Sequence, residues 1–132
     1  MRVLLDTSAY VALARGHAEV AQRVRRAERI LFSAIIAGEL LQGFRQGSRF
    51  ARNLADLERF LDDPFVLPVH VTMETADRFG LVAAALRSKG KPIPTNDIWI
   101  AAHAMETGAE LLTFDRHFEH VAGLAWTMLR TE

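Results

Sequence analysis

The sequence predicts an α/β fold, with a central parallel sheet of four to five strands flanked by helices on both faces. Two observations predict this class. The chain has 132 residues, of which 50% are hydrophobic and 24% are charged, and this is typical of one globular domain, here spanning residues 1–132. Short apolar runs also alternate with segments of helical periodicity, which is typical of parallel strands joined by crossover helices.

Short apolar runs rich in Val, Ile, Leu and Phe are the expected strands. Each has the length of a buried strand and is bounded by polar or turn residues. Pro68, within the third run, removes a backbone N–H and so indicates a strand at the edge of the sheet. In chain order the expected strands are residues 3–5, 29–32, 65–69, 111–114 and, for a fifth strand, 124–129.

The segments between these runs repeat apolar residues at helical spacing. Thr7 or Ser8 can cap the first helix, Ser33 caps the third, and Thr72 opens the fifth. Gly108 ends the last helix, because glycine readily adopts the left-handed conformation that follows a helix. In chain order the expected helices are residues 7–14, 17–28, 33–46, 49–61, 72–88 and 95–107, with a short turn or helix at 116–118.

The composition excludes several classes of protein. Lys and Arg number 16 and so do Asp and Glu, giving a formal net charge of zero, which argues against a polycation that coats nucleic acid. The chain has no cysteine, which excludes a disulfide scaffold, a thiolate metal site and a cysteine nucleophile. No apolar run is long enough for a signal peptide or a membrane span. We therefore expect a cytoplasmic protein that does not enter membranes.

Two aspartates follow predicted strands at the same edge of the sheet. Asp6 comes directly after the first strand, and Asp115 comes directly after the fourth. In parallel sheets of this kind, function collects at the carboxyl ends of the strands. Either aspartate can equally cap the helix that follows it, and for a single aspartate this is the simpler interpretation.

Two further acids lie on helices and turn inward. Glu39 stands on a helical face that is otherwise apolar, and a lone buried carboxylate is unfavourable unless it is paired or bound to a metal. Alternatively, Glu39 lies at the margin of that face and reaches water. Asp97 suits the first turn of a helix through the helix dipole. It also precedes Ile100 and Ala101 by three and four positions, which turns it toward the interior.

Acids gathered at one edge of a sheet need a cation, because close carboxylates repel one another. Oxygen ligands favour Mg²⁺ or Mn²⁺, and these ions keep bound waters for a phosphate substrate. The pattern therefore indicates metal-assisted hydrolysis of a phosphodiester. One ion lowers the pKa of a water, and a second ion about 3.5–4 Å away would stabilise the leaving oxygen.

Four blocks of sequence with these acids lie in a familiar order along the chain. They are LLDTS at 4–8, SAIIAGEL at 33–40, GKPIPTNDIWIAA at 90–102 and LLTFDRHF at 111–118. Together they resemble the PIN-domain ribonucleases, specifically the VapC-type toxins of bacterial and archaeal toxin–antitoxin pairs. The third and fourth blocks are specific, whereas the opening Asp-Thr-Ser is weak by itself.

The resemblance also implies which residues form the site. Where the family often has Asn or Ser before its fourth acid, this chain has Phe114, a departure that leaves the acid in register. We interpret Arg116, beside that acid, as a contact for RNA phosphate. The expected catalytic and metal-binding acids are Asp6, Glu39, Asp97 and Asp115, and the expected supporting residues are Thr7, Asn96 and Thr113.

The same resemblance implies a Mg²⁺-dependent endoribonuclease, with Mn²⁺ as a second candidate ion. It implies products with a 5′-phosphate and a 3′-hydroxyl. The implied partners are an RNA substrate, a cognate VapB-type antitoxin that blocks the site and a second copy of the chain in a homodimer.

Other functions stay open on the sequence alone. A PIN-domain nuclease of RNA processing or decay would use the same chemistry in a different biological role. A catalytically silent PIN-like module that binds RNA or a partner would be favoured by a missing acid, and no acid is missing. A dinucleotide-binding fold is excluded because no glycine-rich turn follows the first strand.

The histidines receive no catalytic role from the sequence. There are five of them, and His117 and His120 are three apart, so they can share a helical turn. A metal site there would need a third ligand, and the sequence shows none. We expect His103 to lie on the partly exposed side of its helix.

Overall fold

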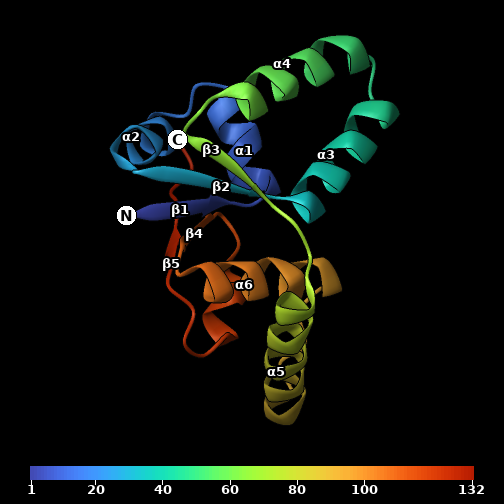
Figure 1. Cartoon of the computed structure of the whole chain (residues 1–132), viewed down its shortest axis with the longest axis vertical. Coiled ribbons are helices and arrows are strands. Elements are labelled where there is room, and N and C mark those ends of the chain that lie inside the picture. Colours follow the sequence, from blue (N-terminus) through green and yellow to red (C-terminus); the bar gives the residue numbers. More distant parts are fainter.

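A five-stranded sheet forms the centre of the protein, which a computed structural model describes over residues 1–132. All pairs of neighbouring strands are parallel, in the order β3-β2-β1-β4-β5, and Figure 1 shows the strands between two groups of helices. The predicted α/β class and parallel sheet are confirmed. The strands are β1 (Arg2–Leu5), β2 (Arg29–Ser33), β3 (Val66–Val69), β4 (Glu110–Thr113) and β5 (Trp126–Met128).

The three central strands hold the core of the sheet. Leu4 of β1 pairs in register with Leu31 of β2 on one side and with Leu111 of β4 on the other. All three side chains are buried. Strands covered on both faces need apolar residues at every position rather than at alternate ones, which explains why the sequence shows continuous apolar runs here.

The sequence predicted one edge strand of the sheet, β3, more accurately than the other, β5. β3 is an edge strand, as Pro68 indicated, because it pairs with β2 alone. At the other edge, β5 is shorter than the predicted segment 124–129. Phe114 was predicted to end the fourth strand, but β4 stops at Thr113, whose side chain accepts a hydrogen bond from the Asp115 backbone N–H at 2.9 Å and so turns the chain away from the sheet.

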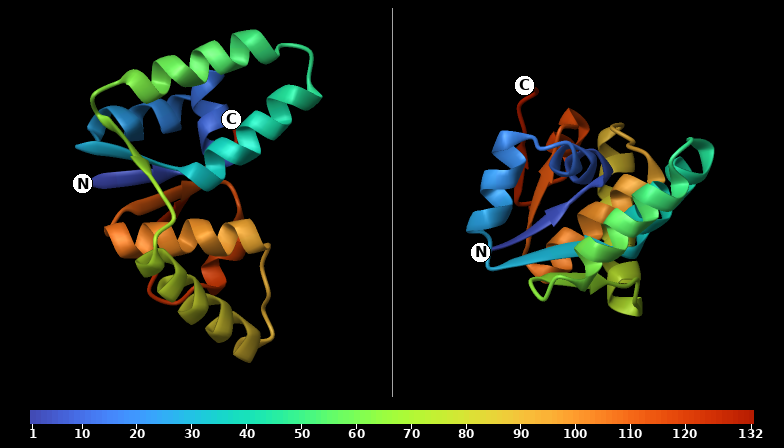
Figure 2. Two further views of the ribbon diagram at one scale, coloured as in Figure 1. Left: turned by 45° about the vertical axis from the view of Figure 1, so that its right-hand side comes forward. Right: turned by 90° about the horizontal axis from the view of Figure 1, so that it is seen from above.

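The direction of the crossovers sorts the helices onto the two faces. The chain moves from β1 to β2 to β3 and then returns to β4, and right-handed crossovers place helices on opposite faces when the direction reverses. Figures 1 and 2 accordingly show α1, α2 and α4 on one side, α5 and α6 on the other, and α3 with α4 projecting as an arm. No helix combines the length and the apolarity that crossing a membrane requires. The helices are α1 (Thr7–Ala14), α2 (Ala18–Arg26), α3 (Ala34–Gln46), α4 (Phe50–Asp62), α5 (Met73–Lys89), α6 (Thr95–Thr107) and the short 3₁₀ helix η1 (Arg116–His120).

The reversal makes the boundary between β1 and β4 a topological switch point, where open α/β sheets have a crevice. Ligands in open α/β sheets bind at such a switch point, outside the carboxyl ends of the strands. Asp6 follows β1 and Asp115 follows β4, so both residues lie at this crevice. The order of the strands, which the sequence did not show, therefore decides which two strand ends become neighbours.

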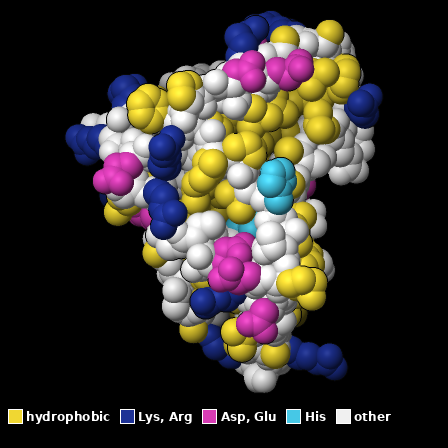
Figure 3. Space-filling view, in the orientation of Figure 1, with side chains coloured by type: hydrophobic (Ala, Val, Ile, Leu, Met, Phe, Trp, Pro, Cys, Tyr) yellow, Lys and Arg dark blue, Asp and Glu magenta, His cyan; other side chains and the backbone are white.

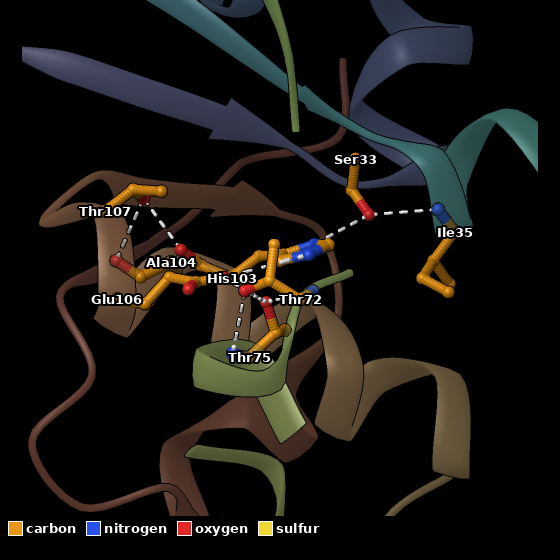
Figure 4. A network of polar contacts seen from close by, with 8 residues as sticks. All are labelled: Ser33, Ile35, Thr72, Thr75, His103, Ala104, Glu106 and Thr107. Atoms are coloured by element: carbon orange, nitrogen blue, oxygen red, sulfur yellow. Dashed lines mark hydrogen bonds and ion pairs between the residues drawn. The ribbon is translucent and has the colours of Figure 1, made fainter. Parts of the chain in front are cut away.

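The environment of His103 contradicts the sequence-based expectation. The side chain is fully buried rather than partly exposed, because α6 packs against the sheet on one side and against α5 on the other. Its Nδ1 is hydrogen-bonded to Ser33 Oγ at 2.8 Å, and the nearby Thr75 hydroxyl donates to Glu106 Oε1 at 2.6 Å. Figure 4 shows this network joining the start of α3 to α5 and α6.

We expect His103 to make folding stability depend on pH. Burial lowers the pKa of its imidazole below the ordinary value of 6.5, and the charge of Glu106 opposes this only in part. The unfolded chain therefore binds this proton more readily than the folded chain does. Above the pKa of His103 in the unfolded chain, this residue does not make stability depend on pH. As the pH falls from that value toward the pKa of His103 in the folded chain, the free energy of unfolding decreases by at most about 1.4 kcal/mol per pH unit.

Chemical denaturation of the wild type and His103→Gln between about pH 5 and about pH 7 measures this contribution. The unfolding free energy of the wild type should fall more steeply on acidification than that of His103→Gln. The control His120→Gln changes a histidine of η1 outside the network and should keep the wild-type slope. Equal slopes in all three proteins would contradict the assignment.

Candidate active site

Asp6 is held at the end of β1 by three hydrogen bonds. The backbone N–H of Ala9 donates to its Oδ1 at 2.9 Å, and the Ser8 hydroxyl donates to the same atom at 2.8 Å. The Thr113 hydroxyl donates to Oδ2. Asp6 is therefore the N-cap of α1. This confirms the capping interpretation of Asp6, whereas Thr7 and Ser8, also named as possible caps, lie inside the helix. Burial raises the pKa of Asp6 despite these hydrogen bonds, and the charge of Asp115 adds to the effect.

Asp115 is connected to Asp6 through Thr113. The Thr113 side chain donates to Asp6 and accepts from the backbone N–H of Asp115. Asp115 caps η1 by accepting from the His117 backbone N–H at 3.2 Å, and its side chain is about half exposed, at 49%. Both strand-end aspartates thus cap the following helix, and both also face the crevice between β1 and β4.

Glu39 is oriented from two other elements. The Thr7 hydroxyl, at the start of α1, donates to Glu39 Oε1 at 2.6 Å. The Asn96 amide, in the first turn of α6, donates to Oε2 at 3.3 Å. Glu39 is half-buried and both of its oxygens have partners, so it is neither a lone buried carboxylate nor a solvated one at the margin of its helix.

Asp97 contacts a histidine that the sequence analysis left without a role. His117 Nε2 lies 2.6 Å from Asp97 Oδ2, and His117 Nδ1 lies 2.9 Å from Asp115 Oδ1. Burial raises the pKa of Asp97; His117 opposes this rise, while the charges of Glu39 and Asp115 add to it. The acids are thus close enough to disfavour one another's charge.

This donor set fits a divalent cation. Ligand atoms of Asp97, Asp115 and His117 lie within 4.8 Å of one another. Thr113 links Asp115 to Asp6, and Glu39 is near enough for its charge to act on Asp97. Carboxylate oxygens are the ligands that Mg²⁺ and Mn²⁺ accept. A cation would offset both the burial and the mutual repulsion that raise the pKa values of Asp6 and Asp97.

The structure brings together most of the residues that the sequence singled out. Thr113 links Asp6 to Asp115, and Glu39 is hydrogen-bonded to Thr7 and Asn96. Asp97 meets the other acids through its contact with His117 and through the charges of Glu39 and Asp115. Arg116 is exposed and lines a separate hollow with Met128 and Arg130, so its contact with RNA stays a prediction. The sequence analysis missed His117. Its position two residues after the fourth acid was a signal, because an aspartate that caps a helix turns the chain back and brings the next residues close to its side chain.

A groove opens beside the site. It has a volume of about 510 Å³ and lies between α1, α3 and α4, with Thr7 and Glu39 in its wall. Arg15, Arg49 and Arg52 line it together with apolar side chains. Figure 3 shows hydrophobic side chains gathered over α3 and α4. The groove thus joins a surface of arginines, Asp56 and apolar side chains to Glu39.

Comparison with known proteins agrees with this geometry. A model of the PIN-domain family matches residues 3–124. Ribonuclease VapC2 of Haemophilus influenzae is 34% identical over 130 residues, which cover 94% of this chain and 95% of that protein. The VapBC-1 structure from nontypeable Haemophilus influenzae superposes with a TM-score of 0.85 at 26% identity, covering 97% and 98% of the two chains.

The VapBC2 structure from Rickettsia felis, bound to a DNA fragment from its promoter, has the same fold. Its TM-score is 0.87 at 23% identity, covering 98% of this chain and 100% of that chain. A five-stranded parallel sheet with acids at the carboxyl ends of β1 and β4, together with the family match, defines the class: the chain belongs to the PIN-domain family. Within that family it is of the VapC type.

Proposed function

We propose that this protein is a Mg²⁺-dependent endoribonuclease, with Mn²⁺ as a second candidate ion, and that it is the toxin of a toxin–antitoxin pair. The observation that carries the proposal is the convergence of carboxylates from β1, α3, α6 and the β4–η1 turn on one crevice. The similarity to VapC ribonucleases supports RNA as the substrate. The cytoplasm, where RNA is abundant, is the proposed site of action.

Asp6, Glu39, Asp97 and Asp115 would hold the metal. When bound, such an ion lowers the pKa of a water for attack on phosphorus and stabilises charge on the phosphate oxygens. The protein's own part is preorganisation. Thr7 and Asn96 aim the two oxygens of Glu39, and the groups around Asp6 hold its carboxylate in one orientation, so little reorganisation is needed when RNA arrives.

Metal removal tests the proposal. Purified protein is incubated with total bacterial RNA in Mg²⁺, in EDTA and in EDTA with excess Mg²⁺ restored. We expect discrete fragments in the first and third reactions, with 5′-phosphate ends that allow ligation. Unchanged cleavage in EDTA would contradict metal dependence, and intact RNA in all three reactions would contradict the nuclease.

An antitoxin of the VapB type is the partner in this proposal. The groove between α1, α3 and α4 is suited to a segment that carries apolar and acidic side chains, because it combines apolar walls with Arg15, Arg49 and Arg52. Thr7 and Glu39 line it, so a segment seated there would cover Glu39. The VapBC structures similar to this chain support such a complex.

A homodimer is also part of the proposal. Large hydrophobic side chains are exposed on and around β3 and along α5. Large apolar side chains left exposed in this way are typical of protein–protein contacts, and a second copy of the chain would cover them. The exposed residues are Phe65, Leu67, Val71, Met73 and Leu81.

A further inference from the structure

His117 places an imidazole ring between two of the acids. Its Nε2 is 2.6 Å from Asp97 Oδ2 and its Nδ1 is 2.9 Å from Asp115 Oδ1. The next residue, Phe118, is fully buried in the core, and the centroid of the Phe118 ring lies 4.9 Å from that of the His117 ring. Phe118 therefore anchors the His117 ring to the core. The position of the imidazole is thus set by the packing of η1.

The contact of Nε2 with Asp97 is short but poorly aligned for a hydrogen bond. Nε2 is buried and has no hydrogen-bond partner, although the carboxylate oxygen is only 2.6 Å away. An N–H on this atom would therefore not be aimed at that oxygen. Two atoms that coordinate the same metal ion also lie beside one another without a hydrogen bond between them.

A cation would satisfy both atoms at once. A buried nitrogen without a partner is unfavourable, and so is a partly buried carboxylate without a cation beside it. Nδ1, on the far side of the ring, faces the Asp115 carboxylate. Histidines that bind metals commonly contact a carboxylate through their second nitrogen, which fixes the ring, and His117 has this arrangement.

We propose that His117 supplies a nitrogen ligand to the metal centre and thereby makes the site prefer Mn²⁺ to Mg²⁺. The inference rests on the proposed metal site of the nuclease and extends it to a ligand and an ion. Mg²⁺ is a hard ion that takes oxygen ligands and keeps its waters, whereas imidazole favours first-row transition ions. Nε2 is the assigned ligand atom, together with Oδ2 of Asp97.

Electron spin-echo spectroscopy of Mn²⁺ bound to the full-length protein tests the ligand directly. A coordinated imidazole gives a ¹⁴N modulation, and carboxylates and waters give none. We expect this modulation in the wild type and in the control His120→Gln, which alters a histidine one turn further along η1. We expect it to disappear in His117→Gln, whose amide offers an oxygen in place of the ring nitrogen.

Binding titrations with Mn²⁺ and with Mg²⁺ separate this role from a structural one. His117→Gln should weaken Mn²⁺ binding at least about tenfold and change Mg²⁺ binding by less than about threefold. If His117→Gln weakened the binding of both ions to the same extent, the proposal would be overturned and the role of His117 would be purely structural. A wild-type Mn²⁺ complex without nitrogen modulation would also overturn the proposal.

The two proposals fail in different ways. If the wild type cleaves RNA with Mg²⁺ but its bound Mn²⁺ shows no nitrogen ligand, the assignment of His117 is wrong and the nuclease stands. If the wild type binds neither ion and cleaves no RNA, the proposed function itself is wrong, and the assignment of His117 is overturned with it.

Discussion

Asp97→Asn is expected to reduce RNA cleavage by at least about a hundredfold to a thousandfold, the loss seen when one preorganised electrostatic group is removed from an active site. Asparagine keeps the shape of the side chain and removes the charge that would hold the metal. Asp97 lies against His117 and feels the charges of Glu39 and Asp115, so it stands at the centre of the acids. Initial rates on total RNA in Mg²⁺ measure the effect.

The fold should survive this substitution. Burial already disfavours the charged form of Asp97, and a neutral amide in its place removes that penalty. The matched control is Asp77→Asn, which changes an exposed aspartate of α5 and should cleave at the wild-type rate. Wild-type cleavage by Asp97→Asn, with circular dichroism unchanged in both variants, would show that the acidic crevice is not the active site.

Phe118→Ala is expected to lower the free energy of unfolding by about 3–5 kcal/mol, the range for phenylalanine truncated in a core. Phe118 is fully buried and belongs to the hydrophobic core. Since domains of this size are stable by only about 5–15 kcal/mol, the variant should be close to unfolding. Urea denaturation followed by circular dichroism gives the free energy and its slope with denaturant.

The control for this loss is Glu119→Ala, a truncation at an exposed side chain of the same short helix. It should change the free energy of unfolding by less than about 0.5 kcal/mol, as surface substitutions usually do. A loss of less than about 1 kcal/mol in Phe118→Ala would mean that η1 can detach from the core without unfolding the rest. The position of His117 would then be set by something other than Phe118.

These two variants separate the chemistry of the site from the packing that holds it. Asp97 contributes charge at the surface of the crevice, and its loss is expected to affect activity alone. Phe118 contributes burial beneath η1, and its loss is expected to affect stability and, through His117 and Asp115, the geometry of the site. A nuclease whose carboxylates come from separate helices and strand ends depends both on the charge of these acids and on the packing that holds the elements together.

Much of the architecture could be predicted from the sequence because its signals are local. Buried parallel strands need continuous apolar runs, so the strands around Leu4, Leu31 and Leu111 were readable directly. Pro68 marked an edge because it lacks a backbone donor. The errors, such as Phe114 placed inside a strand, lie at element ends, where one side-chain hydrogen bond decides the boundary.

The acids could also be recognised in the sequence. An aspartate at a strand end and an acid on an apolar helical face each stand out within a single strand or helix, without knowledge of the tertiary structure. The sequence alone thus determined the α/β class, the parallel strands and the choice of Asp6, Glu39, Asp97 and Asp115 as candidates. Their catalytic and metal-binding roles stay predictions that Asp97→Asn begins to test.

Only the tertiary structure decided how these residues meet. The strand order β3-β2-β1-β4-β5 makes the ends of β1 and β4 neighbours, and this order depends on contacts between segments far apart in the chain. The same contacts bury His103 between the sheet and α5, and they bring His117 against Asp97, twenty residues earlier. Local periodicity carries no information about such pairs, because their proximity arises when separate elements pack.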